Sequence, residues 1–174
     1  MLFRSSNIVS INADLPTKSQ FNYIKKVTIN QSLNAIDLSC HIDSIAVIDY
    51  YSIYRSERDK NSFGWIADVP FNGTSSINYT DYNVDVSSHY YNYHVFPVDT
   101  CGEILSAGSV STLSDTSYGQ TILLETVVNR DLTNSIIFNA YDGWLGKVEF
   151  YYLYRSVNLD RKSTRLNSSH TSIS

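Results

Sequence analysis

The sequence predicts an all-β fold built from antiparallel β-sandwich modules, and three observations support this prediction. Residues that favour strands and turns are abundant, with 14 tyrosines against a single methionine. Short runs of alternating hydrophobic and polar residues follow one another between turn signals. A strand pattern near residue 50 also recurs 100 residues later. The hydrophobic fraction of 43% is sufficient for packed cores, so we expect folded modules and not a disordered chain.

The first module is expected at residues 17–115 and contains seven expected strands. Turn signals such as Asn72-Gly73 separate the runs. The expected strands are 23–29, 36–40, 50–56, 63–69, 76–79, 91–97 and 104–113. Seven strands in ~95 residues is the size of one sandwich module. Alternate residues of a strand face the same side, which places six side chains in the core: Ile36, Leu38, Tyr51, Ile53, Tyr93 and Val95.

A second copy of the same strand pattern follows the first. The later segment of each match keeps the order of aromatic, aliphatic and polar residues of the earlier one. The matching segments are 23–29 with 120–125, 36–40 with 136–140, and 50–56 with 150–156. Three strands that agree in order and spacing indicate an internal repeat. We therefore expect residues 116–159 to be a second module, truncated after its first three strands.

The two ends of the chain differ from the modules. Residues 6–10 weakly match 107–111, so we expect residues 1–16 to be the remnant of a preceding module or, alternatively, an N-terminal arm. Residues 160–170 resemble, codon for codon, the translation of a common sequencing-library adapter. We therefore expect residues 160–174 to be a non-native tail, which is left out when the fold is predicted, the alternative being a basic polar tail.

Four segments carry a family resemblance: Tyr51-x-Ile53-Tyr54-Arg55-Ser56, Tyr79-x-Asp81, Tyr91-x-Tyr93-x-Val95 and Val98-Asp99-Thr100-Cys101-Gly102. They resemble fibronectin type III-like repeats, which are Ig-like β-sandwiches. More narrowly, they are similar to the repeats of large bacterial surface proteins with a gliding-motility-associated C-terminal domain, and of related phage virion proteins. In one respect the sequence departs from the family, because the usual tryptophan of the second strand is Cys40 in the first copy and Phe138 in the second.

The resemblance implies a non-enzymatic structural or interaction repeat in a large exported surface protein of the adhesion or gliding-motility type. It also implies an extracellular or cell-surface location and contacts with neighbouring modules of the same chain. The alternatives are a module of a phage tail or other virion protein, or a carbohydrate-binding accessory module of an exported enzyme.

Three residues are expected to have structural roles. Tyr91 lies where a tyrosine corner would place its hydroxyl on the backbone across the sandwich. Cys40 lies near the end of the second strand and Cys101 just beyond the sixth, and both strands run toward the same end of a sandwich. They form either a disulfide, which needs Cα atoms within about 7 Å, or a buried cysteine and an isolated loop cysteine.

Motifs of catalysis and cofactor binding are not found in the sequence, so we expect no enzyme and no cofactor. There is no Gly-x-Ser-x-Gly elbow, no His-Glu-x-x-His and no phosphate-binding glycine loop. Residues 81–85 alternate oxygen ligands as a calcium loop does, but Val86 replaces the glycine and Asn92 the glutamate, so a plain loop is favoured. A net charge of −4 without a basic cluster argues against nucleic acid, and no run approaches the ~20 apolar residues of a membrane span.

Aromatic residues at outward strand positions or in loops form the candidate ligand surface: Tyr50, Tyr54, Trp65, Tyr82 and Tyr90. Tyrosine and tryptophan are enriched at binding surfaces because they combine apolar faces with polar tips. Among these residues, Trp65 and Tyr54 are the candidates for contact with a protein or glycan partner. The alternative is that outward tyrosines stabilise the sheet through cross-strand pairs.

Overall fold

The computed structural model describes residues 19–58, 62–98, 118–141, 148–157, 160–167 and 172–173. Strands are the regular elements of these ranges, and none of the described residues is helical. All strand pairs are antiparallel, so the prediction of an all-β antiparallel sandwich is confirmed. None of the described residues belongs to a helix long and apolar enough to cross a membrane.

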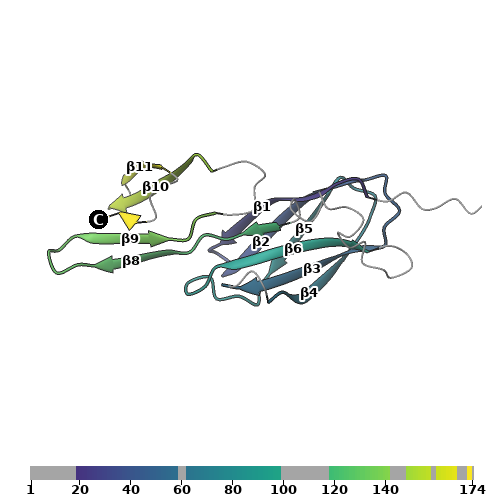
Figure 1. Cartoon of the computed structure of the whole chain (residues 1–174), viewed down its shortest axis with the longest axis horizontal. Coiled ribbons are helices and arrows are strands. Elements are labelled where there is room, and N and C mark those ends of the chain that lie inside the picture. Colours follow the sequence, from purple (N-terminus) through teal and green to yellow (C-terminus); the bar gives the residue numbers. More distant parts are fainter. Residues whose placement is uncertain are drawn as a thin grey trace, which may run out of the picture.

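Two sheets form the sandwich of the first module (Figure 1). The three-stranded sheet has the order β1 (Asn22–Asn30), β2 (Ala35–Ile42) and β5 (Ser76–Asp81). The four-stranded sheet has the order β4 (Gly64–Pro70), β3 (Tyr50–Glu57), β6 (Tyr91–Val98) and β7 (Tyr118–Gln120). The first six strands lie where the sequence predicts them, because β-branched and aromatic residues alternate with polar ones along each run.

The core lies between these sheets and is made from the side chains predicted for it. All six expected core residues have 2% or less of their surface exposed: Ile36, Leu38, Tyr51, Ile53, Tyr93 and Val95. Burying each such side chain contributes about 1.5–3 kcal/mol to stability. The period of two along a strand was therefore sufficient to identify the centre of the module.

The short strand β7 extends the first module past residue 115, where the sequence analysis places the boundary. Asn92, Tyr93 and His94 of β6 pair with β7. Gly119 faces inward, and a Cβ atom at this position would lie 2.6 Å from Cγ2 of Val27 in β1. Strand pairing thus assigns Tyr118–Gln120 to the first module. The strand expected at 104–113 lies outside the described residues.

The second copy contains strands in the expected order: β8 (Leu124–Val128), β9 (Asn134–Phe138) and β10 (Phe150–Val157). Figure 1 shows β8 and β9 as a hairpin beyond one end of the sandwich. Its first strand starts at Leu124, later than the expected 120–125, because Gln120 pairs with β6. The rings of Phe138 and Tyr151 pack 5.0 Å apart. Tyr151 matches Tyr51 of the first core, so this position supplies a hydrophobic contact in both copies.

Two further strands lie in the expected tail. Strand β11 (Asp160–Asn167) pairs with β10, and β12 (Ser172–Ile173) pairs with β9. Ladder pairing uses backbone N–H and C=O groups, which any sequence supplies. These pairs therefore do not bear on the origin of residues 160–170.

Candidate functional site

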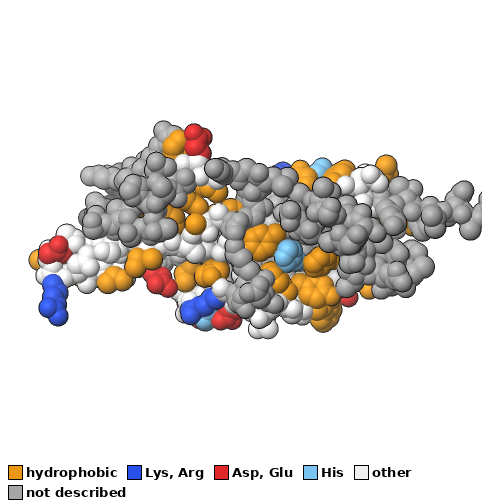
Figure 2. Space-filling model, in the orientation of Figure 1, with side chains coloured by type: hydrophobic (Ala, Val, Ile, Leu, Met, Phe, Trp, Pro, Cys, Tyr) orange, Lys and Arg blue, Asp and Glu red, His pale blue; other side chains and the backbone are white. Residues whose placement is uncertain are grey.

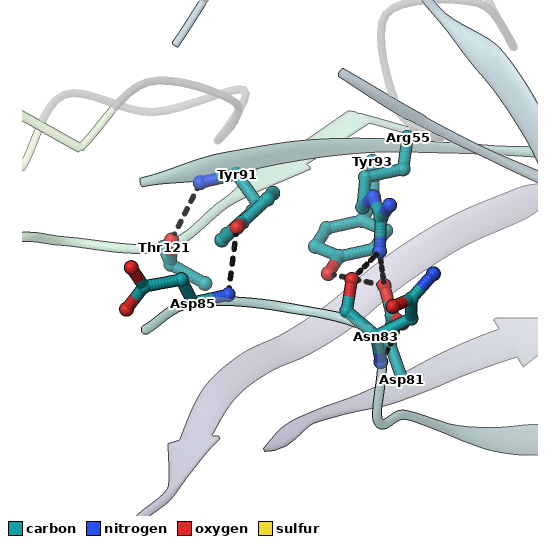
Figure 3. Close-up of polar contacts among 7 residues, drawn as sticks. All are labelled: Arg55, Asp81, Asn83, Asp85, Tyr91, Tyr93 and Thr121. Atoms are coloured by element: carbon teal, nitrogen blue, oxygen red, sulfur yellow. Dashed lines mark hydrogen bonds and ion pairs between the residues drawn. The ribbon is translucent and has the colours of Figure 1, made fainter. Parts of the chain in front are cut away.

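An ion pair between a half-buried arginine and a buried aspartate links the two sheets near the end of β5 (Figure 3). Nη1 of Arg55 in β3 donates to Oδ2 of Asp81 at 2.8 Å and to the carbonyl oxygen of Asn83 at 2.7 Å. The hydroxyl of Tyr93 donates to the same Asp81 oxygen at 3.0 Å, and the backbone N–H of Asn83 donates to Oδ1 at 3.1 Å. Only 3% of the Asp81 side chain is exposed, so these partners take the place of water around its oxygens.

The protonation states of this cluster suit a structural role. Burial, followed by the charge of Asp81, raises the pKa of Tyr93 well above its ordinary value, so the hydroxyl keeps its proton and remains a donor. Burial by itself lowers the pKa of Arg55, but the hydrogen bond and charge of Asp81 outweigh it and the pKa is raised overall. The Asp81 carboxylate, which the sequence placed first in a calcium-like loop, therefore serves to bind Arg55.

Tyr91 holds the loop after β5 against β6. Its hydroxyl accepts the backbone N–H of Asp85, six residues upstream, at 2.8 Å. The ring is 3% exposed, and the guanidinium carbon of Arg55 lies 5.4 Å from its centroid. This is the geometry of a tyrosine corner, in which a buried ring fixes the chain that crosses from one sheet to the other.

Of the two cysteines, Cys40 is among the residues that the structure describes. Cys40 has a free thiol in the core and is 2% exposed. Burial raises its pKa to about 12, so the thiolate needed for nucleophilic or redox chemistry does not form near neutral pH. Cys101 lies outside the described residues.

Aromatic side chains form a row across the outer face of the four-stranded sheet. Trp65 of β4 pairs with Tyr54 of β3, Tyr54 pairs with His94 of β6, and His94 pairs with Tyr118 of β7. We call these four residues the aromatic row. Figure 2 shows hydrophobic side chains gathered around a histidine over β3, β4 and β6. Neighbouring strands lie about 4.8 Å apart, so the row spans roughly 14 Å. The structure thus brings Trp65 and Tyr54, the predicted ligand surface, into direct register.

Contacts with neighbouring side chains hold the rings of the row in place. The ring of Tyr54 meets that of Phe96 edge-on at 5.5 Å. His94 packs against Phe63 at 4.5 Å and against Tyr118 at 5.3 Å. Cross-strand aromatic pairs contribute to the stability of a sheet, which is the role that the alternative interpretation gives to outward tyrosines. The alternation of residues along β6 indicates that His94 lies on the outer face of the sheet. It does not indicate that the rings of Phe63 and Tyr118 cover His94 and leave it half-buried.

Trp65 is the most accessible member of the row. It is 58% exposed, and its indole Nε1 donates to Oδ1 of Asp68 at 2.9 Å. The hydroxyl of Ser52 donates to the same oxygen at 2.6 Å. A tryptophan held in one orientation loses little conformational entropy when a ligand binds, which favours recognition.

Two other tyrosines expected on the ligand surface, Tyr82 and Tyr90, lie in loops outside the row. Tyr82 is 67% exposed in the loop after β5. The hydroxyl of Tyr90 donates to the carbonyl oxygen of Arg58, so this ring ties the loop before β6 to the end of β3. Within the described ranges, no group of three or more histidine, cysteine, aspartate or glutamate side chains could hold a metal ion.

His94 should make stability depend on pH. Burial lowers its pKa from 6.5, so the unfolded chain binds this proton more readily than the folded one. The contribution is complete above about pH 6.5 and is lost as the pH falls below that value toward the folded pKa. His94→Gln should therefore flatten the fall in unfolding free energy between about pH 6.5 and 5, measured by urea unfolding. Equal slopes in the two proteins would contradict the assignment.

Comparisons with known proteins do not assign the chain to a family. No protein-family profile matches the chain, and no curated protein matches it. A solved structure described as an Fn3-like protein from Clostridium thermocellum is similar at a TM-score of 0.36 and 22% sequence identity, covering 51% of this chain and 80% of that chain. The fold assignment rests on the strand pairing and the core described above.

Proposed function

We propose that the chain is part of a non-enzymatic structural and interaction repeat in a large exported surface protein, of the adhesion or gliding-motility-associated type. One observation carries the proposal: strands β1 to β3 and β8 to β10 follow in the same order, with hydrophobic residues at matching positions. Chains of this kind extend a protein by joining similar domains in series, each with its own core. The expected location is the cell surface or the extracellular space.

Antibodies raised against the first module test this location. They should label intact, unpermeabilised cells of the source organism, and brief protease treatment of whole cells should remove the label. Labelling that appears only after the cells are opened would overturn the proposal. Labelling of purified phage particles, with none on uninfected cells, would assign the repeat to a virion instead.

The aromatic row supports a second function, the binding of a glycan. Aromatic faces pack against the C–H groups of sugar rings, and Trp65, which is 58% exposed, offers such a face. The test is a glycan array probed with the wild type, with the Trp65→Ala, Tyr54→Ala double variant and with Tyr82→Ala as a control for an exposed tyrosine outside the row. Binding should fall at least about tenfold in the double variant only. No binding by the wild type would set this function aside.

A further inference from the structure

A segment of three residues, 121–123, joins the two copies. Strand β7 ends at Gln120 and β8 begins at Leu124. Domain boundaries usually fall in exposed, flexible segments that few contacts cross, and relative motion of the domains is then expected. Here the backbone of the segment is hydrogen-bonded to both copies.

The first module binds the segment through Tyr91 and Thr121. The backbone N–H of Thr121 donates to the carbonyl oxygen of Tyr91 at 2.9 Å. The backbone N–H of Tyr91 donates in return to Oγ1 of Thr121 at 2.8 Å (Figure 3). Thr121 is 3% exposed, so this end of the segment is part of the first module. Tyr91 thus anchors the loop after β5 with its hydroxyl and the segment with its backbone.

The second copy binds the same segment through Asn139, the residue that directly follows β9. The Oδ1 atom of Asn139 accepts the backbone N–H of Leu123 at 2.6 Å. Its Nδ2 atom donates to the carbonyl oxygen of Thr121 at 3.0 Å. The Asn139 side chain therefore binds both ends of the three-residue segment. Thr121 is hydrogen-bonded both to Tyr91 of the first module and to Asn139 of the second copy.

The first module repeats this arrangement at its own entrance. Asp43 directly follows β2, the strand that corresponds to β9. Its Oδ2 atom accepts the backbone N–H of Gln20, two residues before β1, at 3.0 Å, and its Oδ1 atom accepts that of Ile45 at 3.1 Å. Asp43 is 4% exposed. Both copies thus place an aspartate or asparagine oxygen after the second strand to bind the backbone that leads into the first.

We propose that the aspartate or asparagine after the second strand of each module is a joint clamp, which binds the segment leading into the first strand of that module. This inference rests on the proposed function as a repeat and adds how consecutive modules are oriented. Because Asn139 contacts a segment that Tyr91 already fixes, the second copy has a defined direction relative to the first. The partner of the clamp is the adjoining module of the same chain.

Amide ¹⁵N relaxation of the full chain tests the clamp. In the wild type, amides of β1–β6 and of β8–β9 should report one rotational correlation time. Asn139→Ala should separate the two values, and exchange of the Leu123 amide hydrogen should accelerate at least about tenfold, since its acceptor is lost. The matched control is Asn129→Ala in the β8–β9 turn, which removes contacts with Thr133 and Ser135 only and should keep one correlation time.

Asn139→Asp provides a second, milder variant. It keeps an oxygen for the Leu123 N–H and loses the donor to Thr121, so Leu123 should stay protected from exchange. If the alanine variant unfolds β8 and β9, retained protection in Asn139→Asp supports the clamp and lost protection overturns it. Two different correlation times in the wild type would also overturn the clamp. So would an Asn139→Ala variant that keeps a single correlation time and shows unchanged exchange of the Leu123 amide hydrogen. Neither result depends on where the protein is located, which the antibody experiment decides separately.

Discussion

Replacing Arg55 with alanine should lower the free energy of unfolding of the first module by about 3–5 kcal/mol. The substitution leaves the Asp81 carboxylate, which is 3% exposed, without its positive partner in the interior of the sandwich. Tyr93 and the Asn83 backbone N–H would still donate to it, but neutral donors do not compensate a buried charge. Urea unfolding followed by circular dichroism measures the loss.

Two variants separate the buried charge from the loss of a side chain. Arg58→Ala removes an exposed arginine that donates to the carbonyl oxygen of Ser88, and it should cost less than about 1 kcal/mol. Adding Asp81→Asn to Arg55→Ala should recover part of the stability, because no unpaired charge then remains buried. A loss in Arg55→Ala no larger than that in Arg58→Ala would show that the ion pair does not support the fold.

Gly119→Ala should destabilise the first module by about 1–3 kcal/mol through overpacking. The new Cβ would lie 2.6 Å from Cγ2 of Val27 and 2.8 Å from Cγ2 of Ile24, and both methyl groups belong to β-branched side chains with little rotamer freedom. Relief of the clash requires β7 to move away from β1. Differential scanning calorimetry of the full chain measures the effect.

Gly64→Ala is the matched control for this substitution. Gly64 lies in β4, and no atom comes within 4 Å of a Cβ built there, so its effect should stay within about 0.5 kcal/mol. Equal effects of the two alanines would mean that β7 does not pack against β1. The boundary of the first module would then return to the position expected from the sequence.

Periodicity in the sequence predicted the sandwich because it reports which face of a strand is buried. Tyr51 and Ile53, two residues apart in β3, are both in the core, as are Tyr93 and Val95 in β6. Such a pattern needs several residues to become visible. Strand β7 has three residues, one of them glycine, and shows no such pattern. It is recognised as a strand from its pairing with β6.

Contacts between distant residues were not predictable from the pattern. Arg55 and Asp81 are 26 positions apart and belong to separate motifs, neither of which indicates that they pair. Tyr91 was different, because the tyrosine corner is a local arrangement that spans six residues. The sequence carries no signal for the role of Asn139, since an asparagine after a strand is an ordinary turn residue.

The aromatic row illustrates the same distinction. The sequence predicts that Trp65 and Tyr54 point outward, and their residue types suggest a ligand surface. Their register, however, depends on the bulge between Ile53 and Tyr54 in the pairing of β3 with β4. A bulge shifts which side chains stand opposite each other, and its position follows from the assembled sheet.

The most direct test is the unfolding of a fragment that ends at Thr121, compared with the full chain. If residues up to 121 close on a core of their own, the fragment should be soluble and unfold in urea in one cooperative transition. Its midpoint should match that of the first module in the full chain. A fragment that shows no cooperative transition, while the full chain does, would contradict a self-contained sandwich that ends with β7.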